Sequence, residues 1–284
     1  MKALNIFSVV LIFILLTILS QVGGIILLLW ILIFRYFKTK LTKPWARRTI
    51  NAFGFMVFYM IFNLLIIPFL AGLGGKARLP MSKSGNLVPV TYWTAIFMRN
   101  YIKESGKEKL LKIADEFAQK HPGLKVKYMD CNYPFYICTP TIPKGYISKK
   151  PLVTFPLTEG LIPHITHMGD KADIALVYND ENGEPSNLTP TAIGYGSSVD
   201  PFPNETPIAC NTWKYSLMYR TLPNSNNGLS KDLSRELILT FRKYLSTKIF
   251  FEKHLVERFN LKGNFSNAGC NSVRHDDHFH VQFK

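Results

Sequence analysis

The chain has 284 residues, a net charge of +15 and 47% hydrophobic residues, enough for one medium-sized domain and a further segment. The first 76 residues hold eight Lys or Arg and no Asp or Glu, which leaves 26 basic against 19 acidic residues in the remainder. This mild excess argues against a nucleic-acid-binding surface, so we expect no nucleic-acid partner.

Two long apolar stretches open the chain, at residues 4–34 and 49–73. Each reaches the roughly 20 residues that a helix needs to cross a bilayer. The first is long enough to tilt, or to bend at Gly23-Gly24. A cleaved signal peptide is the alternative for this stretch, but its apolar part exceeds the roughly 7–15 residues usual in such peptides. We expect two transmembrane helices, with the lipid bilayer as a partner.

The segment 35–48 between these stretches holds six basic residues and no acidic one. Short loops rich in Lys and Arg stay in the cytoplasm. The sequence therefore predicts that the N-terminus and everything after residue 73 lie outside, although Lys2 opposes this weakly. We divide the chain into a membrane anchor (1–76), a linker (77–89) and an exported domain (90–284).

The exported part shows helical and extended patterns in no βαβ order. Apolar residues at helical spacing predict helices over 108–120 and 231–248, and a shorter one over 252–259. Extended patterns predict strands at 126–129, at 135–138, in the apolar run that begins near Asp173, and at the C-terminal end. This mixture favours the α+β fold class over a doubly wound sheet.

Three of the seven histidines lie within six positions near the C-terminal end, at His275, His278 and His280. From 278 onward, polar and apolar side chains alternate with the two-residue period of a β-strand. Side chains at i and i+2 leave the same face of a strand, so His278 and His280 point together. Two imidazoles directed at one place form half of a metal site.

The other half of the site is predicted about 110 residues earlier. His164 and His167 precede a strand-like apolar run, and Asp173 lies where that run begins. A carboxylate there is costly to bury unless it is paired or bound to a cation. An imidazole and a carboxylate from this segment, with an imidazole from the terminal strand, make a three-ligand site. Three protein ligands and an open fourth position are typical of catalytic zinc.

The order His164-x-x-His167, Asp173, His275-x-x-His278-x-His280 resembles that of the penicillin-insensitive murein endopeptidases. These belong to a wider group of zinc peptidases that includes lysostaphin-type enzymes, D-alanyl-D-alanine carboxypeptidases and the hedgehog signalling domain. The resemblance covers two short segments. It implies a small antiparallel sheet with flanking helices, one zinc ion, and peptidoglycan peptides as partners. It also implies a bacterial cytoplasmic membrane, with the domain on the periplasmic or extracellular side.

The resemblance also implies roles for single residues. The zinc ligands would be His167, Asp173 and His280. His278 would lie beside the zinc-bound water or the developing oxyanion. The spacing from His167 to Asp173 is one position shorter than is usual in the family, which leaves Asp170 as a rival ligand.

The remaining candidates serve proton transfer and substrate binding. The chain has no His-Glu-x-x-His motif, so a histidine must act as base; the candidates are His278, with His164 and His275 on the substrate side or behind the ligands. Asp276 or Asp277 could hold a ring N–H. Arg274 could bind a substrate carboxylate or form a structural ion pair. Tyr195, in the long loop 186–206, is a candidate substrate contact; a loose surface loop is the alternative.

All four cysteines follow the membrane segments, which agrees with an oxidising compartment. We expect disulfides Cys131–Cys138 and Cys210–Cys270, because the first pair is close in sequence. Four reduced, buried thiols are the alternative.

The sequence thus predicts a membrane-anchored zinc peptidase that hydrolyses peptidoglycan stem peptides or their cross-links. Carboxypeptidase action on a peptide end is the nearest rival within this class. A zinc-binding but non-catalytic module and an inactive partner that organises other envelope proteins are alternatives from other classes.

Overall fold

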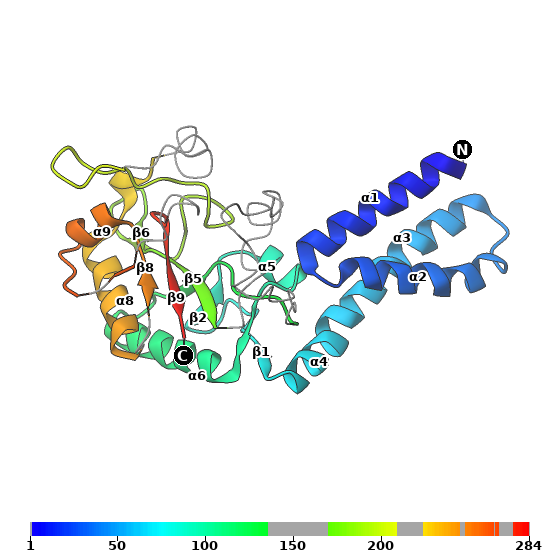
Figure 1. Cartoon of the computed structure of the whole chain (residues 1–284), viewed down its shortest axis with the longest axis horizontal. Coiled ribbons are helices and arrows are strands. Elements are labelled where there is room, and N and C mark those ends of the chain that lie inside the picture. The colour runs from blue at the N-terminus through cyan, green and yellow to red at the C-terminus, as the bar shows by residue number, and fades with distance from the viewer. Residues whose placement is uncertain are drawn as a thin grey trace, which may run out of the picture.

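The computed structural model describes residues 2–135, 170–208, 224–244, 248–263, 265–266 and 275–283, with side chains from residue 6 onward. Within these residues the chain forms an elongated bundle of N-terminal helices and a domain that mixes helices with small sheets (Figure 1). The expected α+β class is confirmed.

The first apolar stretch forms two helices. α1 (Lys2–Ser20) and α2 (Gly23–Lys38) lie side by side and run in opposite directions (Figure 1). Gln21, in the turn between them, has a φ of 65°. Gly24 allows the close approach of the two helices, because a Cβ there would lie 2.1 Å from Thr17 Oγ1. The bend that the sequence allows in this stretch is therefore a full reversal of the chain.

The second apolar stretch is one continuous helical run. α3 (Pro44–Ile61), the π-helical turn η1 (Phe62–Ile66) and α4 (Ile67–Leu73) follow one another without a break. Among the described residues, Pro44–Leu73 is the one helix long and apolar enough to cross a membrane, whereas Ile6–Ser20 is apolar but shorter. One candidate span is thus present in this part of the chain, where the sequence predicts two.

The range 77–89, expected as a linker, carries regular structure. β1 (Lys76–Arg78) pairs antiparallel with β3 (Tyr101–Lys103), and β2 (Leu87–Pro89) pairs in parallel with β4 (Val126–Tyr128). All three residues of β2 are buried. The bundle and the domain are therefore joined through paired strands.

Five strands form the main sheet, in the order β2-β4-β5-β9-β8. The three strands not yet introduced are β5 (Lys171–Ala175), β8 (Ile249–Phe250) and β9 (His278–Gln282). Every neighbouring pair is antiparallel except β2 and β4. The sheet is therefore mixed, where the family resemblance implies a purely antiparallel one.

Two helices cover one face of this sheet. α6 (Glu104–Lys120) and α8 (Lys231–Tyr244) confirm the helices predicted over 108–120 and 231–248, with residues 245–247 outside the described part. Their buried residues recur at helical spacing: Leu110, Ile113, Ala114 and Phe117 on α6, and Ser234, Leu237, Ile238 and Phe241 on α8. The ring of Phe241 meets that of Phe279 on β9 at 5.0 Å. The core lies between these helices and the sheet, so polar chemistry is confined to the opposite face.

Shorter elements complete the described domain. The helix predicted over 252–259 is α9 (Lys253–Arg258), and the ambiguous aromatic segment near residue 92 forms the short helix α5 (Tyr92–Ile96). β6 (Tyr178–Asn179) and β7 (Pro185–Ser186) pair with each other, and η4 (Asn226–Gly228) precedes α8. The predicted strand at 135–138 lies outside the described residues from 136 onward.

Candidate metal centre

The pairing of β5 with β9 brings the two predicted halves of the site together. Asp173 lies opposite His280 and Ala175 opposite His278 in an antiparallel register. Since side chains alternate along both strands, these residues share one face, and the apolar residues between them face the core. The carboxylate of Asp173 thus meets the imidazoles of His278 and His280 on one sheet, although more than 100 residues of sequence separate it from them.

Asp173 lies at the centre of this polar face, with a side chain only 3% exposed. Its Oδ1 is 2.6 Å from His280 Nδ1, and the Tyr195 hydroxyl donates to its Oδ2 over 2.5 Å. A carboxylate only accepts, so His280 carries its proton on Nδ1 in this pairing. Burial raises the pKa of Tyr195 well above its usual value, and the Asp173 charge adds to the rise, so the hydroxyl stays a donor.

His278 is the most enclosed of the three terminal histidines. Its Nδ1 is 2.5 Å from Asp277 Oδ1, and its Nε2 is 3.7 Å from Asp173 Oδ2. The ring meets that of Tyr195 edge-on, at 5.1 Å between centroids. Burial acts to lower the pKa of His278, but the carboxylates of Asp173 and Asp277 outweigh it and raise the pKa to about 9. The expectation that Asp276 or Asp277 holds a ring nitrogen is met by Asp277.

His275 completes a cluster of three imidazoles. Its ring centroid lies 4.9 Å from that of His278 and 5.8 Å from that of His280. Its backbone is fixed by Glu252, whose Oε1 accepts the His275 N–H at 3.1 Å and whose own N–H donates to the His275 carbonyl at 3.2 Å. The segment before β9 is therefore anchored to the start of α9.

The loop that carries Tyr195 is held by the two aspartates before β9. The Gly196 N–H donates to Asp277 Oδ2 at 3.1 Å, and the Val199 N–H donates to Asp276 Oδ2 at 3.2 Å. Asp277 thereby binds the loop with one oxygen and the His278 ring with the other. The loop is thus fastened to the strand that carries the imidazoles, and the loose-loop alternative is wrong for this part of it.

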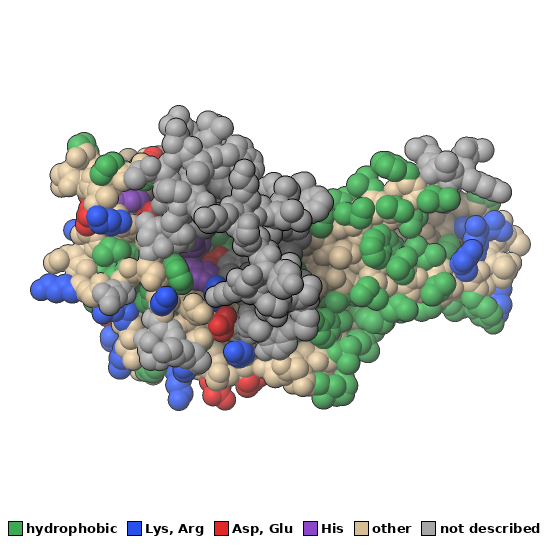
Figure 2. Space-filling model, in the orientation of Figure 1, with side chains coloured by type: hydrophobic (Ala, Val, Ile, Leu, Met, Phe, Trp, Pro, Cys, Tyr) green, Lys and Arg blue, Asp and Glu red, His purple; other side chains and the backbone are tan. Residues whose placement is uncertain are grey.

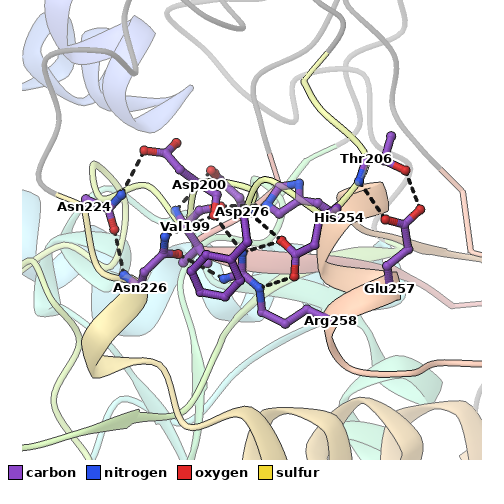
Figure 3. A network of polar contacts seen from close by, with 11 residues as sticks. Val199, Asp200, Thr206, Asn224, Asn226, His254, Glu257, Arg258 and Asp276 are labelled. Carbon is purple, nitrogen blue, oxygen red and sulfur yellow. Dashed lines mark hydrogen bonds and ion pairs between the residues drawn. The ribbon is translucent and has the colours of Figure 1, made fainter.

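A second network fixes the same loop from outside (Figure 3). The guanidinium of Arg258 on α9 bonds both oxygens of Glu205 at 2.6 and 2.8 Å and the carbonyl of Asp200 at 2.7 Å. His254 Nε2 lies 2.6 Å from the carbonyl of Val199, next to the N–H that Asp276 binds. His254 is thus a buried histidine that binds the loop through the Val199 carbonyl.

Further site residues come from elements that sequence patterns do not connect. Arg99, whose side chain is 23% exposed, forms an ion pair with the buried Asp130, and the carbonyl of Asp130 accepts the Asp173 N–H at 2.8 Å. Burial acts to lower the pKa of Arg99, but the charge of Asp130 outweighs this effect, so the pKa is raised above its usual value. Glu252 and this pair carry no local motif, so no spacing in the sequence points to them.

Several predicted residues lie outside the described part of the chain. They are His164, His167, Arg274, Cys138, Cys210 and Cys270. Cys131 is described and buried, so neither expected disulfide is tested. The rival ligand Asp170 lies just before β5, with its Oδ2 3.4 Å from the side-chain amide of Gln282 at the end of β9 away from His278.

The donors of this centre are of the kind that zinc binds, imidazole and carboxylate. Asp173 Oδ1 and His280 Nδ1 lie at hydrogen-bond distance, whereas two ligands of tetrahedral zinc lie about 3.3 Å apart; these atoms would have to separate by roughly 0.7 Å, and Nδ1 would have to lose its proton, to bind zinc together. Among the described residues, no group of three or more His, Cys, Asp or Glu is arranged to hold a metal ion. His167, the expected third ligand, is outside them, so the fit is judged on two of the three ligands.

No protein-family model matches the chain, and a search of the curated proteins finds no match to it. The resemblance to the murein endopeptidases is therefore carried by the two histidine-containing segments alone.

Proposed function

We propose that the domain is a zinc-dependent peptidase that acts on peptidoglycan stem peptides or their cross-links. The observation that supports this most is the pairing of Asp173 with His280 across β5 and β9. An expected ligand from mid-chain and one from the C-terminal strand thereby share one buried face, together with the two other terminal imidazoles. The substrate class comes from the motif resemblance.

In this proposal Asp173 and His280, with His167, hold one zinc ion. When bound, the ion would supply a water molecule with a pKa near 7 and a Lewis acid for the scissile carbonyl. Tyr195 keeps the Asp173 carboxylate oriented. Asp277 occupies Nδ1 of His278, which leaves Nε2 facing the centre as the atom that gives or takes a proton.

His275 and His164 are proposed to act on the substrate side, and Arg274 to bind a substrate carboxylate. A bound terminal carboxylate favours carboxypeptidase action, whereas cleavage within a cross-link does not need one. Both reactions use the same proton transfers, so product analysis has to separate them. A zinc-binding module without catalysis is the alternative.

The test uses the full-length protein in detergent with purified murein sacculi. We expect zinc-dependent release of muropeptides, loss of release with a chelator, and its return with added zinc. The variant His280→Ala should be inactive. Gln282→Ala, two positions further along the same face of β9, is the matched control and should retain release.

Two results would contradict the proposal in different ways. One zinc ion per chain with no release from any sacculus or stem peptide would favour the non-catalytic module. If the wild-type protein binds no zinc, the proposed metal centre is refuted. Mass spectrometry of the released products would assign the scissile bond.

A further inference from the structure

The two ends of the helical bundle differ in charge. The end far from the domain holds the N-terminus of α1, the C-terminal end of α2 and the start of α3 (Figure 1). Lys and Arg side chains gather there (Figure 2), and the sequence places six of them at Arg35, Lys38, Lys40, Lys43, Arg47 and Arg48. No Asp or Glu occurs in the first 76 residues. This end suits anionic headgroups on the cytoplasmic side of a membrane.

The flanks of the bundle are apolar on every helix (Figure 2). Large hydrophobic side chains are exposed by more than a third of their surface, among them Leu11 and Ile14 on α1, Leu28 and Leu32 on α2, Phe53 on α3 and Phe69 on α4. A groove of about 570 Å³ on α3 and η1, closed by Ile96 of the domain, is lined by apolar side chains and Tyr59. Exposed apolar surface of this extent is unfavourable in water but is what acyl chains cover.

The turn between α1 and α2 is fixed at the domain end. The Gln21 side-chain amide bonds the backbone of Phe135 in both directions, each at 3.2 Å. The Tyr133 hydroxyl donates to the carbonyl of Ile18 at 3.0 Å. Val22 and Ile26 are buried in the same cluster as Met98 and Tyr101 of the domain. The turn and the domain therefore lie on the same side of any membrane that surrounds the bundle.

The lengths of the helices fit this arrangement. At about 1.5 Å per residue, the 19 residues of α1 span roughly 28 Å and the 16 residues of α2 roughly 24 Å. The hydrocarbon core of a bilayer is about 30 Å thick. Arg35 and Lys38 in the last turn of α2 can extend to the headgroups and make up the difference.

We propose that α1, α2 and the α3–α4 run each cross the bilayer, so that the N-terminus lies on the side opposite the metal-centre domain. This differs from the expectation from sequence, in which the first apolar stretch crosses once and the N-terminus lies outside. Lys2 then joins the cytoplasmic basic end and no longer opposes the topology. The proposal does not depend on zinc binding or catalysis.

The test is a topology map of the full chain in bacterial spheroplasts. Epitope tags are placed at the N-terminus, in the 39–43 loop and at the C-terminus, and protease is added from outside. We expect the C-terminal tag to be lost at once, and the other two to be lost only after the membrane is permeabilised. The loop tag is the control, because both topologies place it inside.

A second measurement guards against an effect of the N-terminal tag on insertion. Lys2→Cys should react with a membrane-impermeant maleimide, above the wild-type signal, only after lysis. Loss of the N-terminal tag with the loop tag protected, or labelling of Lys2→Cys before lysis, would overturn the third span. Release of the protein by alkaline carbonate without detergent would also overturn it, and would assign the apolar flanks to contacts between copies of the chain.

Discussion

The hydroxyl of Tyr195 and the carboxylate of Asp173 are joined by a 2.5 Å hydrogen bond that links the loop over the site to the centre of the sheet. The same carboxylate meets His280 with its other oxygen. The sequence predicts that Tyr195 contacts the substrate, which stays a prediction, and in the structure its hydroxyl is directed at the proposed ligand. Its geometry is that of a residue that positions Asp173.

Removing this hydroxyl should therefore weaken metal binding while leaving the fold intact. We expect Tyr195→Phe to lower the zinc affinity by about 10–100-fold, the usual effect of losing a partner of a metal ligand. Affinity is measured by competition with a chromophoric chelator. Tyr244→Phe, which loses a hydroxyl that bonds Glu116 far from the site, is the control. Equal zinc affinities for Tyr195→Phe and the wild type would contradict the proposal that Tyr195 positions Asp173.

Lys127 on β4 makes the stability of the domain depend on pH. It is 3% exposed, and burial lowers its pKa to about 8, against 10.5 for an ordinary lysine. The folded state releases this proton first as pH rises, so this contribution to stability grows from pH 8 to 10.5, is lost again as pH falls from 10.5 to 8, and is constant below that. The effect amounts to at most about 3 kcal/mol.

Lys127→Met should remove this dependence and stabilise the domain most at pH 7–8. Urea unfolding at several pH values gives the difference in free energy of unfolding between the variant and the wild type. The contributions of the other titrating groups cancel in this difference. Lys112→Met, on the exposed side of α6, controls for the loss of a lysine. A stability difference between Lys127→Met and the wild type that is the same at pH 7.5 and pH 10 would refute the assignment.

Asn63 in the π-helical turn fastens the helical run of α3, η1 and α4 to the domain. Its amide donates to the carbonyls of Ala95 and Ile96 at 3.2 and 2.8 Å, and Arg78 bonds both its side-chain and its backbone oxygen. Asn63→Leu should cost about 1–3 kcal/mol, because buried polar partners lose a hydrogen bond. We expect a lower melting temperature in detergent and faster amide exchange at residues 92–103. Asn51→Leu, which loses an exposed bond to Trp30, should leave that exchange unchanged.

Gly54 sets how closely α2 and α3 approach. A Cβ at this position would lie 2.3 Å from the ring of Trp30, so Gly54→Ala should overpack the bundle and destabilise it by about 1–3 kcal/mol. Gly72→Ala in α4 is the matched control, since a Cβ there meets no atom within 4 Å. Thermal unfolding in detergent compares the two, and equal melting temperatures would show that the helices can separate without cost.

The sequence predicts the site to the extent that local pattern allows. The two-residue period before Phe283 places His278 and His280 on one face, and β9 confirms it. Asp173 lies at the start of an apolar run, where a carboxylate is costly to bury unless it is paired or bound to a cation, and this position indicates a candidate ligand. The register that places it opposite His280 depends on contacts between distant segments, which no local period encodes.

Other features were missed for identifiable physical reasons. Hydropathy continues across Gln21, so the sequence marks the place of a bend with this polar residue and Gly23-Gly24 but does not show that the chain reverses there. β1, β2 and β3 have three residues each, too few for any periodicity to show. Asp130 and Glu252 contribute through backbone and buried contacts whose partners lie far along the chain.

The place of β9 in the sheet has a consequence for the order in which the protein matures. It is the last of the five strands to leave the ribosome, yet it lies between β5 and β8. The helical bundle can form while synthesis continues, but the carboxylate of Asp173 has no imidazole opposite it until residue 280 has emerged from the exit tunnel. A chain interrupted before that point would carry a folded bundle but no pairing of Asp173 with His280.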